Sequence, residues 1–103
     1  MAVMSFPANG STHRHPYDSN TFTWTNTSPV VNGVAYWRLK IGSAPFGYDR
    51  YISQPIPGGT LSDSSLHPQV TARLYATVEW STTGTAGPWS NGGTYTWYNC
   101  TSQ

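Results

Sequence analysis

The sequence predicts an all-β fold of antiparallel sheets, either a sandwich or a barrel, and three observations support this. In several segments apolar and polar residues alternate with a period of two, as in strands with one buried and one wet face. Turn-forming stretches such as "NTSP", "SAPFG", "QPIPGG" and "SNGG" separate these segments. No window repeats apolar residues at the three- and four-residue spacing of an amphipathic helix.

The first half of the chain contains two clear alternating segments. Residues 1–20 are expected to form a short edge strand and a loop. Residues 21–25, "TFTWT", place Phe22 and Trp24 on one face. In residues 34–41, "VAYWRLKI", the predicted inward residues are Ala35, Trp37, Leu39 and Ile41, and the predicted outward residues are Val34, Tyr36, Arg38 and Lys40.

The second half of the chain alternates over a longer stretch. In residues 70–80, "VTARLYATVEW", the predicted inward residues are Val70, Ala72, Leu74, Ala76, Val78 and Trp80, and the predicted outward residues are Thr71, Arg73, Tyr75, Thr77 and Glu79. Near the C-terminus, Tyr95 and Trp97 share a face that we expect to point into the core. Tyr98 lies on the opposite face and is expected to be exposed.

Length and composition indicate one globular domain covering residues 1–103. Such a chain has room for a single core. Charged residues make up only 9% and aromatic residues 15%, whereas a typical domain is about 25% charged. Disordered chains are highly charged and poor in aromatic residues, so disorder is excluded. A formal net charge of +1 gives no basic stripe for nucleic acid, so we expect no nucleic-acid partner.

A family resemblance narrows the fold. Trp24 lies in the second predicted strand, "YWRLKIGSAP" forms the third, "GYDRY" belongs to the next, and a long sixth strand precedes a final one. This pattern, which covers most of the chain, resembles the fibronectin type III-like, immunoglobulin-like domains of bacterial surface and phage proteins. The resemblance implies a β-sandwich of about seven strands in which the third, fourth, sixth and seventh share a sheet. Its motifs specify a fold and no activity.

The chain departs from that family at the expected fifth strand. The usual apolar strand and Leu-Pro turn are replaced by "TLSDSSLHPQ", which is polar and contains a proline. We therefore expect the fifth strand to be short or missing. One of the two sheets would then be thin.

The residues that could support catalysis or bind a metal are sparse. The carboxylates Asp18, Asp49, Asp63 and Glu79 lie in separate segments, with no pair spaced for general acid and base catalysis. In "HRHPYD", His13, His15 and Asp18 could hold zinc, but Pro16 and the loop-like setting favour a solvated loop. The sequence thus predicts a protein that is not an enzyme and has no metal or cofactor.

The single cysteine, Cys100, cannot form an internal disulfide. Its thiol is either silent or an intermolecular contact. The sequons at Asn9 and Asn99 matter only if the protein is secreted from a eukaryotic cell.

The remaining functional indication is a surplus of aromatic residues. Six of the fifteen are expected in the core, which leaves nine for other roles. A predicted outward patch rich in tyrosine and cations is typical of a recognition surface, and it contains Tyr36, Arg38, Lys40, Arg73, Tyr75 and Tyr98. The alternative is that Tyr and Thr are simply suitable residues for an exposed strand.

Two functions fit this surface. The first is a structural or decorating protein of a virus particle that docks, through aromatic patches and strand edges, on capsid or tail proteins or on copies of itself. The second is a carbohydrate-binding or adhesion module of a larger extracellular bacterial protein, in which Trp89, Tyr48 and Tyr51 would stack on sugars. The stretch "MAVMSFPANG" has neither the basic segment nor the apolar run of a signal peptide. No segment has the apolar length of a membrane span, so we expect a location on a virion surface or outside a cell, without membrane insertion.

Overall fold

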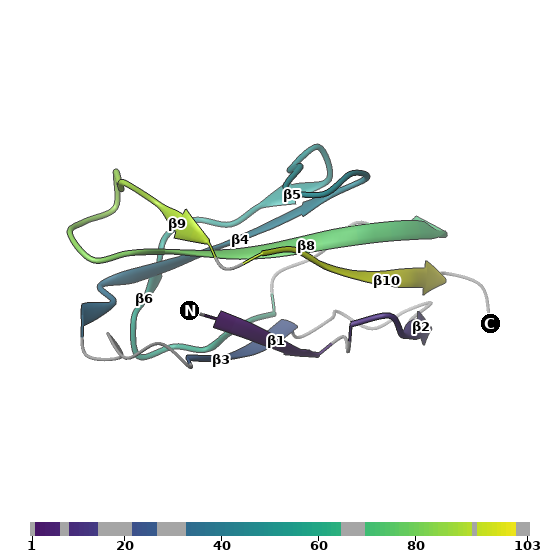
Figure 1. The fold of residues 1–103 in the computed structure, drawn as a ribbon, viewed down its shortest axis with the longest axis horizontal. Helices are drawn as coiled ribbons and strands as arrows, with labels where there is room; N and C mark the ends of the chain where they lie inside the picture. The colour runs from purple at the N-terminus through teal and green to yellow at the C-terminus, as the bar shows by residue number, and fades with distance from the viewer. Residues whose placement is uncertain are drawn as a thin grey trace.

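The computed structural model describes residues 2–6, 9–14, 22–26, 33–64, 70–91 and 93–100. Within these ranges the protein contains strands and no α-helix. The strands form two sheets that lie face to face (Figure 1). All strand pairs are antiparallel except the pair of β2 and β10. The predicted all-β antiparallel fold is confirmed.

The two sheets differ greatly in size. The smaller sheet has the order β1 (Ala2–Phe6), β3 (Phe22–Asn26), β7 (Ser62–Asp63). The larger sheet has the order β2 (Thr12–Arg14), β10 (Tyr95–Cys100), β8 (Ala72–Ser81), β4 (Tyr36–Gly42), β5 (Tyr51–Ile52). Two further short strands join it, because β6 (Ile56–Pro57) pairs with β4 and β9 (Ser90–Asn91) pairs with β8. The four segments expected to share a sheet, now β4, β5, β8 and β10, do so.

The smaller sheet is thin because, within the described residues, the polar segment expected to form the fifth strand contributes only a short one. β7 contains only two residues and pairs with the start of β3. The backbone N–H of Trp24 continues this contact by donating to the carbonyl of Leu61 at 3.1 Å. The expectation of a short strand is confirmed within the described residues, and residues 65–69 lie outside them.

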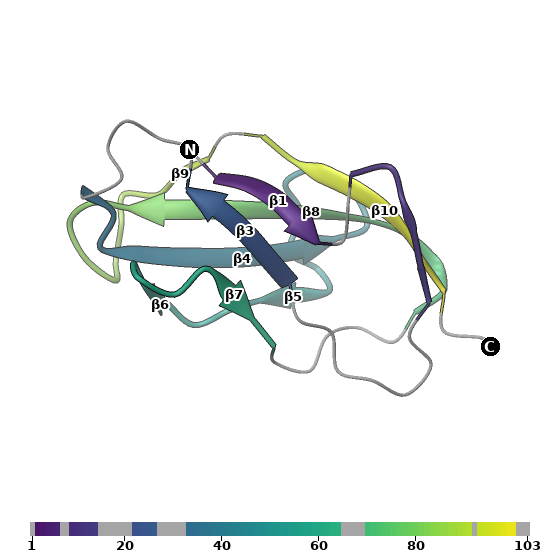
Figure 2. The same ribbon diagram turned by 90° about the horizontal axis from the view of Figure 1, so that it is seen from below.

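The N-terminal segment contributes a strand to each sheet, where the sequence predicted one edge strand. β1 pairs antiparallel with β3, and β2 then pairs parallel with β10 (Figure 2). Just before β2, Gly10 has a φ of 82°, which suits a residue without a Cβ. Its N–H donates to the carbonyl of Thr96 at 2.6 Å, and the Asn9 side chain accepts from the Thr96 N–H at 2.9 Å.

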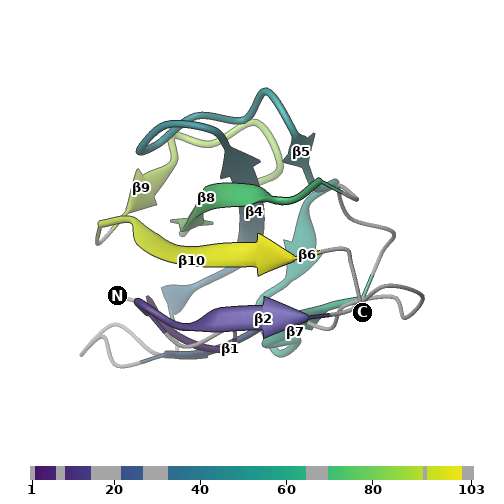
Figure 3. The same ribbon diagram turned by 90° about the vertical axis from the view of Figure 1, so that its right-hand side faces the viewer.

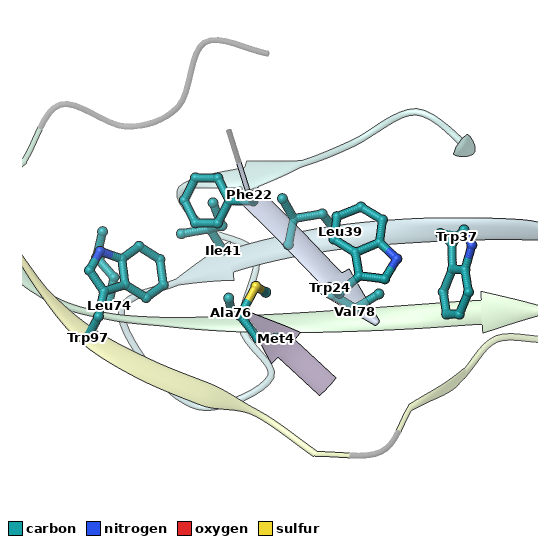
Figure 4. Close-up of a cluster of buried hydrophobic side chains, with 10 residues drawn as sticks. All are labelled: Met4, Phe22, Trp24, Trp37, Leu39, Ile41, Leu74, Ala76, Val78 and Trp97. Atoms are coloured by element: carbon teal, nitrogen blue, oxygen red, sulfur yellow. The ribbon is translucent and has the colours of Figure 1, made fainter. Parts of the chain in front are cut away.

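The core lies between the two sheets, and ten hydrophobic side chains are buried there (Figure 4). They are Met4, Phe22, Trp24, Trp37, Leu39, Ile41, Leu74, Ala76, Val78 and Trp97. Aromatic rings meet edge to face, with Phe22 at 5.4 Å from Trp97 and Trp24 at 6.1 Å from Trp37 between centroids. Trp80 and Tyr95 are partly buried against this cluster. The predicted inward set is therefore confirmed except for Ala35, which precedes β4, is only partly buried and does not belong to this cluster.

Three further residues depart from the predicted alternation. Val34 was predicted to face outward, but it packs against the core because β4 begins only at Tyr36. Thr77 and Glu79 lie on the predicted wet face of β8, yet both are buried. Their burial depends on side chains from neighbouring strands and loops.

Candidate functional site

The outer face of the larger sheet, which points away from the smaller sheet, is the candidate site. Figure 3 shows the smaller sheet on one side of β8 and β10, with the loops at β5 and β9 on the other. Cross-strand partners share a face of a sheet, and Tyr98 pairs with Arg73 while Gly42 pairs with Tyr75. The outer face thus carries six predicted residues, which are Tyr36, Arg38, Lys40, Arg73, Tyr75 and Tyr98. Tyr36 pairs with Ser81, at the opposite end of β4 and β8 from Arg73, Tyr75 and Tyr98.

A buried carboxylate lies at the centre of this face. Glu79 Oε1 accepts hydrogen bonds from Arg38 Nε at 2.8 Å and from Arg38 Nη2, and Glu79 Oε2 accepts from Lys40 Nζ at 3.1 Å. Glu79 is only 6% exposed. Removing such a group from water is costly unless opposite charges surround it. Arg38 and Lys40 therefore have a structural role. The sequence predicts them only as residues of a binding surface.

Two aromatic rings lie over these cations. The Arg38 guanidinium carbon is 4.4 Å from the centroid of the Trp89 ring, and Lys40 Nζ is 5.6 Å from the centroid of the Tyr48 ring. Both distances are within the range of cation–π attraction. Trp89 was predicted to offer an open ring for sugar stacking, but it is partly buried because Arg38 covers one side of the ring. Tyr48 is 60% exposed.

The loop of residues 43–50, which joins β4 to β5, folds back over the outer face. A Cβ on Gly42 would lie 2.5 Å from the carbonyl carbon of Gly47, so only glycine permits this approach. The Gly47 N–H donates to the Ala44 carbonyl at 3.0 Å and closes a turn. Within this turn Phe46 has a φ of 64°, which is uncommon for a bulky residue.

Asp49 holds the two ends of the same loop together. Its carboxylate accepts hydrogen bonds from the Ser43 N–H at 2.9 Å and from the Ser43 hydroxyl at 2.7 Å. These two bonds, the backbone one foremost, hold the pKa of Asp49 below its ordinary value of 3.8. The Asp49 carboxylate therefore has a local structural role in positioning Phe46 and Tyr48.

Most of the large exposed hydrophobic side chains lie on this side of the molecule. The described residues include five large exposed hydrophobic side chains. Tyr98, at 38% exposure, lies on the outer face, as does Ile52, at 43%, because it pairs with Lys40. Phe46, at 45%, and Tyr48 lie on the loop of residues 43–50. The fifth, Leu61, lies beside the smaller sheet.

Phe46 and Ile52 are not among the residues that the sequence predicts for this surface. Phe46 is one of the nine aromatic residues outside the predicted core. The alternation of Tyr51 and Ile52 could have indicated the orientation of Ile52.

Tyr51 does not belong to this surface, contrary to prediction. It pairs with the core residue Ile41 and packs against the core cluster. Its hydroxyl donates to Asp63 Oδ2 at 2.6 Å and so connects β5 of the larger sheet to β7 of the smaller one. The ring is therefore a structural link between the sheets.

The predicted metal ligands are only partly described. Among the residues that the structure describes, no group of three or more His, Cys, Asp or Glu residues could hold a metal ion. His15 and Asp18 lie outside these residues, and so do the side chains of His13 and Cys100.

The two sequon asparagines have structural partners. Asn99 is buried, and its Nδ2 donates to the Val70 carbonyl at 2.7 Å while its Oδ1 accepts from Trp97 Nε1 at 3.2 Å. Asn9 bonds to Thr96 as described above. Both side chains therefore hold strand β10 in place.

No protein-family model, curated protein or solved structure matches this chain. Within the described ranges, no helix could cross a lipid bilayer.

Proposed function

We propose that the protein is a non-catalytic accessory protein on the surface of a virus particle, and that it docks on a protein partner through the outer face of the larger sheet. The observation that carries this proposal is that four of the five large exposed hydrophobic side chains in the described residues lie on that face or its loop. Contiguous exposed apolar patches mark interaction sites on soluble proteins. Tyrosine and arginine, which are both present there, are enriched in protein interfaces.

The described carboxylates support a non-catalytic function. Glu79 is held by Arg38 and Lys40, Asp49 by Ser43, and Asp63 by Tyr51. A general acid or base has to reach a substrate atom directly or through one water. Groups that already hold strands and loops together are poorly suited to that task.

Composition favours a particle surface. Only 9% of the residues are charged. Neighbouring copies with few charges repel one another little, so they can be packed closely on a shell. The immunoglobulin-like resemblance of the sequence is in keeping with this proposal.

The experiment uses particles of the virus that encodes this chain. Mass spectrometry of purified particles should detect the protein, and purified protein should co-sediment with particles that lack it. The double variant Phe46→Ser, Tyr48→Ser should bind at least about tenfold more weakly, since a hot-spot residue contributes about 2 kcal/mol or more. Leu61→Ser, which removes an exposed apolar group from the other side, is the control and should bind like the unmodified protein.

Two results would contradict this proposal. One is the absence of the chain from purified particles together with a failure to co-sediment. The other is unchanged binding by the Phe46→Ser, Tyr48→Ser variant.

A carbohydrate-binding module is the second candidate, and the exposed ring of Tyr48 favours it. Sugars stack their C–H faces on flat rings, and this ring is the most exposed of the large hydrophobic side chains in the described residues. A glycan array would test it with Tyr48→Ala, Trp89→Ala and Tyr36→Ala. Retention of a polysaccharide by the unmodified protein, its loss with Tyr48→Ala, and no binding to particles would favour this candidate over docking.

A further inference from the structure

We infer that the partner of the outer face is an acidic protein surface, one that presents carboxylates next to apolar side chains. This inference rests on the proposed function and names the chemistry of the partner. It depends on the distribution of charge around the exposed rings and not on the net charge of the chain, which is only +1.

Cations predominate on this side of the molecule. Four of the five lysine and arginine residues of the chain, Arg38, Lys40, Arg50 and Arg73, lie on the outer face or on the loop of residues 43–50. The described carboxylates there are Glu79 and Asp49. Glu79 is buried beneath Arg38 and Lys40, and Asp49 is hydrogen bonded to Ser43. A partner therefore meets cations whose charge these carboxylates only partly balance.

Two of the cations are available for contact. Arg50 and Arg73 are exposed, and within the described residues neither forms a salt bridge. The Arg73 guanidinium makes one long hydrogen bond, at 3.4 Å, to the Thr96 hydroxyl. Both guanidinium groups can therefore donate to a carboxylate in the bidentate geometry that arginine favours.

These arginines lie beside the exposed rings. Arg73 pairs with Tyr98 across β8 and β10, and Arg50 follows Tyr48 in the loop between β4 and β5. Since Gly42 pairs with Tyr75, the loop and the start of β8 lie at the same end of the larger sheet. Figure 1 shows this end, where the loop at β5 lies near the start of β8 and the end of β10. Apolar anchors flanked by arginine are typical of binding hot spots in protein interfaces.

A second copy of the chain does not fit this surface. A two-fold dimer places the same patch on both subunits, so each copy would present Arg50 and Arg73 to the same cationic end. Juxtaposed like charges disfavour such an interface. An acidic partner, by contrast, is attracted by the positive charge of Arg50 and Arg73 before contact and forms ion pairs with them at contact.

The experiment selects a random peptide library of twelve residues against the immobilised protein and measures the affinity of the selected peptides. We expect enrichment of Asp and Glu beside apolar residues. The variant Arg50→Gln, Arg73→Gln should bind these peptides at least about tenfold more weakly, the loss expected for charge-assisted hydrogen bonds. The matched control is Thr60→Glu, Ser64→Glu, which lowers the net charge by the same amount at exposed positions off the outer face and should retain at least half of the affinity.

Several results would overturn the inference. These are the selection of neutral or basic peptides, equal binding by the Arg50→Gln, Arg73→Gln variant, or equal weakening by the control variant. Polygalacturonate is the parallel probe for an acidic polysaccharide, and its binding through Arg50 and Arg73 without any peptide selection would also overturn it.

The particle experiment separates this inference from the proposed function. If the Arg50→Gln, Arg73→Gln variant co-sediments with particles as well as the unmodified protein, docking stands and the acidic partner is wrong. If the unmodified protein does not co-sediment, the proposed function is wrong.

Discussion

At the scale of single residues, Glu79 shows how one side chain organises the outer face. It lies on the central strand β8 and joins two cations on β4, each of which has an aromatic ring over it from a different loop. The carboxylate thus connects two strands and two loops. Trp89 and Tyr48 depend on it through Arg38 and Lys40.

We therefore expect Glu79→Gln to lower the free energy of unfolding by about 1–3 kcal/mol, because two cations lose their counter-charge in a mostly buried setting. Urea denaturation monitored by tryptophan fluorescence would measure this loss. Arg73→Gln, which alters an exposed cation on the same face, is the control and should change stability by less than about 0.5 kcal/mol. If the two variants are equally stable, the charge cluster is not a stabilising feature.

At the scale of elements, the two sheets differ in how well their strands are paired. β4 and β8 pair continuously from Tyr36 with Ser81 to Gly42 with Tyr75. β3 and β7 share only two registered pairs. Local opening is easiest where few neighbouring hydrogen bonds must break together.

Hydrogen exchange followed by NMR should therefore find amides at the centre of β4 and β8, such as those of Leu39 and Val78, exchanging at least about tenfold more slowly than the amide of Thr23 in β3. The slow amides would belong to the last unit to open. Equal protection of both sheets would mean that the thin sheet opens only together with the whole domain.

At the scale of the whole molecule, one core joins both sheets. Met4, Phe22 and Trp24 come from the smaller sheet, and the other buried hydrophobic residues come from the larger one. Tyr51 adds a polar link through Asp63. Since neither sheet can bury its apolar face alone, the two should unfold together.

Leu39→Ala removes a fully buried side chain from this core and should cost about 2–5 kcal/mol. Far-UV circular dichroism and tryptophan fluorescence should still report one coincident thermal transition. Leu61→Ala, the same change at an exposed position, should cost less than about 1 kcal/mol. Separate transitions for the two probes would show that the sheets unfold independently.

Local patterns in the chain are enough to predict the all-β fold, the inward faces of β4, β8 and β10, and the shortness of β7. These features depend on neighbours along the chain. Side chains alternate across a strand whatever it packs against, so Trp37, Leu39 and Ile41 had to share a face with one another, as did Leu74, Ala76 and Val78. The same alternation placed Arg38, Arg73 and Tyr98 on the opposite face.

Which loops and strands cover that face cannot be predicted from these local patterns. Five features depend on contacts between residues that are distant in sequence or that meet through a turn. They are the fold-back of residues 43–50, the contact of Arg38 with Trp89, the burial of Glu79, the inward position of Tyr51 and the division of the N-terminal segment between two sheets. Local alternation states which side of a strand a residue occupies. It carries no information about which loop or sheet will cover that side, because burial depends on contacts that form only when the sheets and loops pack together.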